Sequence, residues 1–294
     1  MEISIFEQIT SVLTVKSICS PLGPDIPAGS TADDLETLEC AVNLDPFNYP
    51  SRVVAPDGNV TGIVWFEDYA QLEHASEPVI ESVMQPLEPN ELLSSSTTIL
   101  DAVEIFGSKP NGYFYVIHIN GIIGVLFYRD LFKPLGRLAF LALALEIEDE
   151  ALRLCQSAPI NERCWSSISE NRRRKATDLF KLRYGREPKL QGDEQEDEIV
   201  FLPRPPSDLS LVIGCTNLVD KATMIWKQKL VTPGTQTEIL GFFNDLKEIR
   251  DQCAHPGGDN ELLPKGRLAQ FVNSAKRMRN SLRESMKSHS SRAQ

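Results

Sequence analysis

The sequence lacks the short motifs that mark several large enzyme classes. Its 294 residues contain no G-x-x-x-x-G-K-[ST] loop, no H-E-x-x-H helix and no nucleophile elbow. The sequence therefore gives no support for a kinase, a metalloprotease or a hydrolase built on such an elbow.

Histidine is scarce, and the cysteines are not spaced as metal-binding pairs. The chain has four histidines and six cysteines, and no two cysteines form a C-x-x-C pair. We therefore expect buried thiols rather than a disulfide framework or a zinc site, which predicts a reducing compartment, the cytoplasm. We expect no metal site.

Long apolar runs are absent as well. The most apolar stretch, residues 138–145 (LAFLALAL), is far shorter than the roughly 20 residues that a membrane-spanning helix needs. The first residues, MEISIFEQITSVL, lack the basic start and unbroken apolar run of a signal peptide. We expect a globular chain without membrane association, and its length suggests two domains of roughly 100–200 residues each.

The net charge of −11 is divided unevenly. Residues 1–133 carry 19 acidic and 5 basic side chains, whereas residues 134–294 carry 22 acidic and 25 basic ones. An acidic half repels polyanions, so we expect nucleic acid to bind only the second half. Two basic clusters there are weak candidates for RNA contacts: Arg172, Arg173, Arg174, Lys276, Arg277 and Arg279. The alternative is that they form solvated helix faces.

Residues 1–133 alternate short strands and helices, and one pattern occurs twice. Each copy is a hairpin followed by the start of a helix: residues 53–65 before 66–71, and residues 113–127 before 128–132. Asp57-Gly58 and Asn120-Gly121 supply the turn residues that such hairpins favour. Residues 95–106 add a helix behind a row of Ser and Thr caps.

The repeated segment resembles the closing part of a CBS domain. Gly62 to Asp68 (GIVWFED) and Gly124 to Asp130 (GVLFYRD) both place a strand, a glycine and a following aspartate at the CBS spacing. A CBS pair over residues 1–133 implies a regulatory α/β domain. The resemblance also implies an adenine nucleotide as regulatory ligand, with Asp68 and Asp130 on the ribose hydroxyls.

The sequence departs from the CBS pattern at the phosphate-binding positions. Trp65 and Phe127 stand where Ser or Thr is usual, so polar partners for a phosphate are lost and bulk is added. We expect both aromatic rings to form core or cleft walls. The alternative role for Asp68 and Asp130 is to cap helices, and a further alternative is a pair that serves only as a dimer scaffold.

From Pro134 onward the pattern becomes helical. Five helices are predicted, over residues 135–155, 164–184, 207–230, 235–255 and 264–286. Residues 192–198 (GDEQEDE) are predicted to be an acidic loop, and residues 201–206 (FLPRPP) a stiff connector. The chain as a whole is therefore predicted to be α+β, with a first domain over 1–133 and an all-α bundle over 134–294.

The fourth predicted helix carries the main candidate site. Thr235 and Glu238 form a capping box at its start, and Pro256 ends it because a residue before proline leaves the helical conformation. Arg250 and His255 are five positions apart, about 140° around an ideal helix. They can therefore share one face only if the last turn loosens at His255. Otherwise they cap the last carbonyl groups.

Arg250 to His255 (RDQCAH) resembles the R-x4-6-H motif of the HEPN superfamily, including a polar residue directly after the arginine. The resemblance implies an all-α, dimeric, metal-independent endoribonuclease. His255 would act as the general base on a ribose 2′-hydroxyl, Arg250 would stabilise the charged transition state, and Asp251 would orient one of them. Glu146, Glu148 and Asp149 are candidates to hold Arg250.

Two outcomes remain open for this domain. One is a ribonuclease that cleaves RNA, requires no cofactor and forms a homodimer. The other is a non-catalytic HEPN domain that serves as a dimeric, nucleotide-binding or regulatory module.

Overall fold

The computed structural model describes most of the chain in two compact units. The described residues are 4–31, 34, 49–65, 67–68, 72, 79–108, 112–119, 121–157, 160–190, 208–231, 234–255 and 265–292. The sheet unit comprises Ile9–Ala139 and Asp259–Gly266. The helical unit comprises Met1–Gln8, Phe140–Gly258 and Arg267–Gln294.

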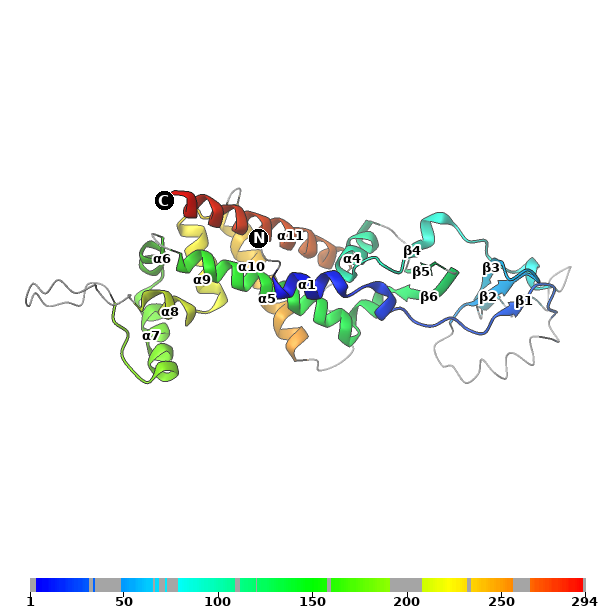
Figure 1. Cartoon of the computed structure of the whole chain (residues 1–294), viewed down its shortest axis with the longest axis horizontal. Coiled ribbons are helices and arrows are strands. Elements are labelled where there is room, and N and C mark those ends of the chain that lie inside the picture. Colours follow the sequence, from blue (N-terminus) through cyan, green and yellow to red (C-terminus); the bar gives the residue numbers. More distant parts are fainter. Residues whose placement is uncertain are drawn as a thin grey trace, which may run out of the picture. The chain divides into compact units, whose positions relative to one another are not determined.

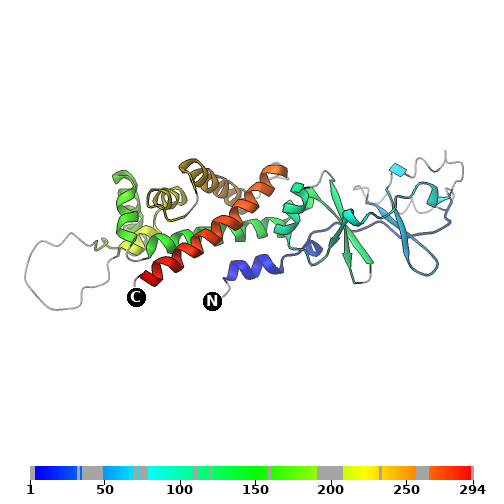
Figure 2. The ribbon, with the colours of Figure 1, turned by 90° about the horizontal axis from the view of Figure 1, so that it is seen from above.

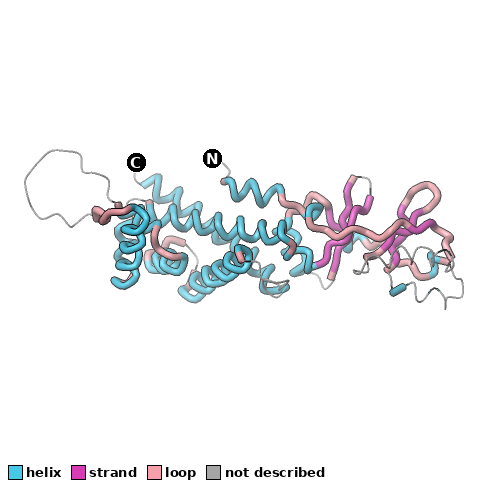
Figure 3. Tube along the Cα trace, turned by 90° about the horizontal axis from the view of Figure 1, so that it is seen from below, coloured by secondary structure: helices cyan, strands magenta, loops and turns pink. Residues whose placement is uncertain are grey.

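Strands occur only in the sheet unit among the described residues (Figure 3). The strands are β1 (Ile26–Pro27), β2 (Ser51–Val54), β3 (Val60–Val64), β4 (Leu92–Ser94), β5 (Tyr113–His118) and β6 (Gly121–Phe127). The α-helices are α1 (Ile5–Val12), α4 (Ile99–Ser108), α5 (Pro134–Gln156), α6 (Asn161–Ser167), α7 (Glu170–Tyr184), α8 (Leu209–Gly214), α9 (Leu218–Lys227), α10 (Gln236–Ala254) and α11 (Lys265–Arg292). Short 3₁₀ helices are η1 (Val15–Ser17), η2 (Ile80–Ser82), η3 (Pro89–Glu91) and η4 (Tyr128–Phe132).

The sheet unit contains two three-stranded sheets of the same topology (Figure 1). β1 pairs parallel with β2, and β2 pairs antiparallel with β3. β4, β5 and β6 repeat this arrangement. Both predicted hairpins are therefore confirmed. The helix predicted after the second hairpin is the 3₁₀ helix η4, whereas most of residues 66–71 lies outside the described residues.

A peptide segment completes each sheet in the same way. Ser20 pairs with Val125 of β6, and Gln85 pairs with Ile63 of β3. Ser20 and Gln85 each follow a 3₁₀ helix by three residues. A glycine one residue before each paired position, Gly124 or Gly62, makes room, because an added Cβ would lie 2.6 Å or 2.9 Å from the segment's carbonyl oxygen.

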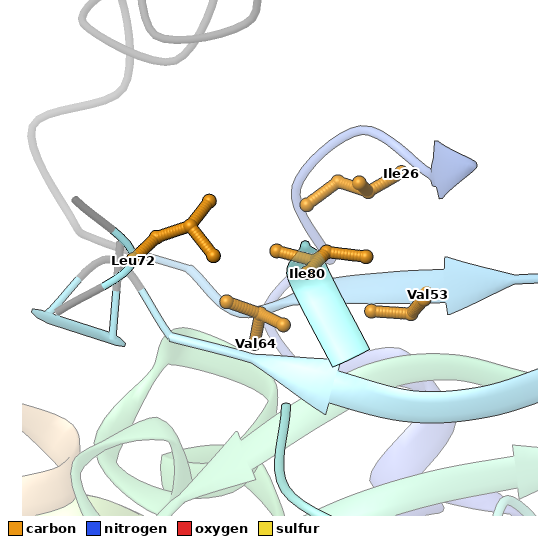
Figure 4. Close-up of a cluster of buried hydrophobic side chains, with 5 residues drawn as sticks. All are labelled: Ile26, Val53, Val64, Leu72 and Ile80. Carbon is orange, nitrogen blue, oxygen red and sulfur yellow. The ribbon is translucent and has the colours of Figure 1, made fainter. Parts of the chain in front are cut away.

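The first sheet has a small apolar core of its own. Ile26, Val53 and Val64, one from each strand, converge with Leu72 and Ile80 (Figure 4). All five side chains are at most 1% exposed. β2 alternates buried and less buried residues because successive side chains point to opposite faces of a sheet, whereas the last three residues of β3 are all buried.

The helical unit contains two breaks that were not predicted. Residues 164–184 were expected to be one helix, but α6 ends at Ser167 and α7 begins at Glu170. Ser169 has extended backbone angles at this junction, as an N-cap residue does. The third predicted helix is likewise divided into α8 and α9 at Asn217, whose side chain accepts a hydrogen bond from the Asp220 N–H and forms a capping box.

The other helices follow the predictions closely. α5 extends over Pro134–Gln156, and α10 begins after the Thr235–Glu238 capping box, which is confirmed. α11 continues to Arg292, farther than predicted. α11 runs alongside α5 (Figure 2), and ion pairs connect the two helices: Glu146–Arg279, Glu146–Arg283 and Glu150–Arg283.

Candidate functional site

Arg250 lies one turn before the end of α10 and is held by two carboxylates. Its Nη1 donates to Glu148 Oε2 of α5 at 2.8 Å. Its Nε and Nη2 both donate to Asp251 Oδ1, at 3.2 and 3.0 Å. The side chain is 26% exposed. A guanidinium has five N–H donors, so two remain without a partner in the described part of the chain.

The three predicted carboxylate partners of Arg250 have different roles. Glu148 contacts it, as predicted. Glu146 is 1% exposed and faces Arg279 and Arg283 instead. Asp149 forms a surface pair with Arg153 at 2.8 Å. A helix turns by about 100° per residue, so adjacent carboxylates on α5 face different neighbours.

Glu148 has a second cationic neighbour that the sequence did not single out. Lys221 of α9 lies 3.7 Å from Glu148 Oε1 and is 3% exposed. Its Nζ donates to the Thr216 carbonyl oxygen at 2.8 Å. Charged lysines are almost never fully buried without a partner, but nothing in the sequence around Lys221 predicts that burial.

His255 is the C-cap residue of α10 and is exposed. Its φ of −124° and ψ of 72° are not helical, which confirms that the chain leaves the helix before Pro256. Its backbone N–H donates to the Asp251 carbonyl oxygen at 3.1 Å. The imidazole is therefore accessible on the turn that also carries Asp251.

The neighbouring charges change the pKa values of this cluster. Burial opposes the charge of Arg250, but hydrogen bonds to Glu148 and Asp251 outweigh it and raise the pKa of Arg250. Burial acts to raise the pKa of Asp251, yet the bond from Arg250 lowers it overall. Burial lowers the pKa of Lys221, and Glu148 only partly offsets this. Arg250 and Asp251 thus each favour the charged form of the other.

The predicted RNA-binding cations have internal partners in several cases. Arg172 Nε lies 3.5 Å from Asp220 Oδ1, Arg174 donates to Asn171, and Arg279 pairs with Glu146 at 3.2 Å. Arg277 donates to Ser274. Arg173 Nε is buried without a partner within the described residues. Lys276 is half-buried and is also engaged in an interaction within the chain.

In the sheet unit, Asp68 and Asp130 occupy equivalent positions with equivalent contacts. Asp68 Oδ2 accepts from the Trp65 N–H at 2.9 Å and from Gln85 Nε2 at 3.3 Å. Asp130 Oδ2 accepts from the Phe127 N–H at 2.8 Å. Both carboxylates therefore make the capping bond that was the alternative to ribose binding.

Asp130 also contacts Ser20 and Lys133. Ser20 Oγ donates to both of its carboxylate oxygens, at 3.1 and 3.2 Å. Lys133 Nζ lies 2.9 Å from Asp130 Oδ1 and donates to the Ile18 carbonyl oxygen at 2.9 Å. Ser20 and Gln85, each in the segment that completes a sheet, were missed because their pairing joins residues far apart in the chain.

Trp65 and Phe127 face each other, together with two tyrosines, between the two sheets. The Trp65 ring centroid lies 4.8 Å from that of Tyr113 and 6.1 Å from that of Phe127. Trp65 Nε1 donates to Tyr115 Oη at 3.2 Å. Burial raises the pKa of Tyr115. The expectation that Trp65 and Phe127 form core or cleft walls is confirmed.

Neither a metal cluster nor a membrane span is found in the described residues. No group of three or more His, Cys, Asp and Glu side chains there is arranged to hold a metal ion. No described helix combines the length and apolar character needed to cross a bilayer.

Comparison with known proteins gives matches among solved structures. The CBS domains of a transcriptional regulator from Streptococcus pneumoniae match with 21% identity and a TM-score of 0.32, covering 42% of this chain and 98% of that one. CBSX2 in complex with AMP matches with 18% identity and a TM-score of 0.32, covering 40% and 93%. The cytosolic domain of the Mg²⁺ channel MgtE in complex with ATP matches with 15% identity and a TM-score of 0.34, covering 43% and 50%. No family model and no curated protein matches the sequence.

Proposed function

We propose that this protein is a metal-independent endoribonuclease of the HEPN type, regulated by a CBS pair. Residues 134–294 would bind and cleave RNA, and residues 1–133 would bind an adenine nucleotide. The protein would act as a homodimer in the cytoplasm. Arg250, Asp251 and His255 would be the catalytic residues, and Arg172, Arg173, Arg174, Lys276, Arg277 and Arg279 would add weaker contacts to RNA.

One observation carries the proposal: Arg250 is fixed by two carboxylates but keeps two N–H donors and is 26% exposed. A guanidinium that is oriented in advance can bind a phosphate through paired hydrogen bonds with little further ordering. His255, the proposed base, is exposed at the end of the same helix.

The proposed reaction is an internal transesterification. His255 takes the proton of a ribose 2′-hydroxyl, and the 2′-oxygen attacks the adjacent phosphorus. Arg250 stabilises the negative charge that develops on the phosphate oxygens. The 5′-oxygen leaves and is protonated by the same histidine or its dimer-related copy. The products are a 2′,3′-cyclic phosphate and a 5′-hydroxyl.

We expect the protein to cleave a mixed pool of single-stranded and structured RNA in the presence of EDTA. His255→Ala should lose this activity because the 2′-hydroxyl is then no longer deprotonated, a loss of about 10²–10⁴-fold. Mass spectrometry of the fragment ends checks the mechanism. Cleavage that leaves 3′-hydroxyl ends, or that depends on a divalent cation, would rule the proposal out.

A second candidate function is a non-catalytic, dimeric RNA- or nucleotide-binding module. The observation that favours it is that all three bonds of Arg250 are to carboxylates of the chain itself, as in a structural ion-pair network. RNA that is bound by the wild-type protein but not cleaved, with or without adenine nucleotide, would support this function over the first.

We expect AMP, ATP or another adenosine compound to raise the melting temperature of the sheet unit. A ligand at 100 times its dissociation constant stabilises the folded state by about 2.7 kcal/mol. Differential scanning calorimetry checks this, with guanosine compounds as the control. Trp65 and Phe127 stand where a CBS domain usually has Ser or Thr for the phosphate. If no adenosine compound changes the melting temperature, residues 1–133 serve as a scaffold rather than as a ligand-binding domain.

A further inference from the structure

Glu148 lies between two cations of different accessibility. On one side it accepts a hydrogen bond from Arg250, which is 26% exposed. On the other side it lies 3.7 Å from Lys221, which is 3% exposed. One carboxylate oxygen serves each cation: Oε2 faces Arg250 and Oε1 faces Lys221. The three side chains come from three helices, α5, α9 and α10.

A carboxylate beside a single cation can rotate, and its partner moves with it. Here Lys221 fixes Oε1, and Lys221 is itself fixed by its 2.8 Å bond to the Thr216 carbonyl oxygen. Thr216 lies in the short connection between α8 and α9. The position of Arg250 Nη1 is thus determined through Glu148 by a backbone atom in another part of the helical unit.

The charges alternate along this series of contacts. Lys221 is followed by Glu148, Arg250, Asp251 and then Lys247, whose Nζ lies 3.6 Å from Asp251 Oδ2. The buried end of this series, at Lys221, is costly to desolvate, and a well-packed apolar replacement for a buried ion pair is often as stable. Stability is therefore a weak reason for a buried lysine at position 221.

We infer that Glu148 and Lys221 are positioning residues, which hold the Arg250 guanidinium in the orientation that receives the phosphate. Glu148 acts directly on Arg250, and Lys221 acts through Glu148. For its kinetic readout this inference rests on the proposed ribonuclease reaction. Neither residue touches the substrate.

The kinetic test uses Glu148→Gln and Lys221→Met in the full chain. A displaced catalytic group can reduce turnover by about 10²-fold, so we expect Glu148→Gln to lower kcat by about this factor with little change in KM. Lys221→Met should lower kcat less, in the same direction. Because Lys221 acts through Glu148, the double variant should be no slower than Glu148→Gln alone.

Matched controls remove a like charge from the same helices. Asp149→Asn removes a carboxylate from the exposed pair with Arg153 on α5. Lys227→Met removes an exposed ammonium from α9. Both should leave kcat and KM unchanged. Equal losses in the controls, or additive losses in the double variant, would overturn the inference. Should Glu148→Gln fail to fold, Lys221→Met keeps the test open, since it retains both Glu148 and Arg250 and removes only the cation beside Glu148 Oε1.

A second measurement does not depend on catalysis. The NMR signal of the Arg250 Nη1–H group that donates to Glu148, assigned by its disappearance in Arg250→Lys, should exchange slowly with solvent in the wild type and in Asp149→Asn. It should be lost to fast exchange in Glu148→Gln and Lys221→Met. If the wild type cleaves no RNA, the proposed function fails while this signal still tests the positioning. A signal that persists in all four proteins would overturn the inference.

Discussion

Replacing Glu146 with alanine is expected to destabilise the helical unit by about 3 kcal/mol, because it breaks a pair with a buried carboxylate and leaves Arg279, which is 19% exposed, without its partner. Glu146 is 1% exposed. Its Oε1 accepts from Arg283 Nη2 at 2.7 Å, and its Oε2 accepts from Arg279 Nη1 at 3.2 Å. Arg283 keeps Glu150 at 2.9 Å, whereas Arg279 has no other acceptor among the described residues. Urea denaturation followed by far-ultraviolet circular dichroism measures the loss.

Two comparisons separate an unpaired charge from a general effect on α5. Asp149→Ala removes a neighbouring carboxylate from a surface pair and should change stability by about 1 kcal/mol or less. Glu146→Met combined with Arg279→Met removes both partners, so it should recover much of the loss of the single variant. If the double variant is as unstable as Glu146→Ala, the lost contacts rather than an uncompensated arginine are responsible.

Local patterns predicted the ends of α10 correctly because the deciding interactions are local. Thr235 and Glu238 are three residues apart, and each satisfies a backbone N–H of the other. His255 precedes a proline, which excludes the helical conformation there. Phe242, Phe243 and Leu246, which recur at helical spacing in this stretch, are buried. Such features need only the sequence within one or two turns.

The two helix breaks were missed for a related reason. Asn217 and Asp220 form a capping box inside a stretch whose apolar spacing continues across the break. Ile168, between two serines, is 4% exposed, so apolar residues flank the first break as well. Periodicity alone gives no signal when both helices bury residues on either side of a junction.

The candidate site was predictable only in part. The resemblance identified Arg250, Asp251 and His255, and α5 was correctly expected to supply a carboxylate. Which of three acidic residues met Arg250 depended on the rotation of α5, which is set by packing in the helical unit. Lys221 gave no signal at all, since an isolated lysine in a helix is usually solvated. The spacing of residues along the sequence does not reveal contacts between distant segments.

In the sheet unit, too, the sequence revealed the repeat but not the contacts between distant segments. The equivalence of Asp68 and Asp130 was visible in the sequence. The partners of these aspartates, Gln85 and Ser20, were not, because each belongs to a segment that pairs with the last strand of a sheet. The parallel strands β1 and β4 are too short, at two and three residues, to show a periodic pattern.

Gly136→Ala is expected to destabilise the sheet unit by about 3 kcal/mol, the upper end of the usual range for overpacking. A Cβ at this position would lie 2.0 Å from the Leu131 carbonyl oxygen and 2.7 Å from its carbonyl carbon. Both atoms belong to the backbone of η4, which ends two residues before α5 begins. No side-chain rotation relieves the clash, so η4 or the first turn of α5 has to move.

The measurement is thermal unfolding followed by the fluorescence of Trp65, the tryptophan of the sheet unit, in a background where Trp165 and Trp226 are replaced by phenylalanine. Gly112→Ala is the matched control, because an added Cβ there meets no atom within 4 Å, and it should lie within about 0.5 kcal/mol of the parent. Asp130 and Lys133 adjoin the displaced turn, so Gly136→Ala should also weaken any stabilisation by adenosine compounds. Equal stabilities for the two variants would mean that η4 and α5 are not packed this closely.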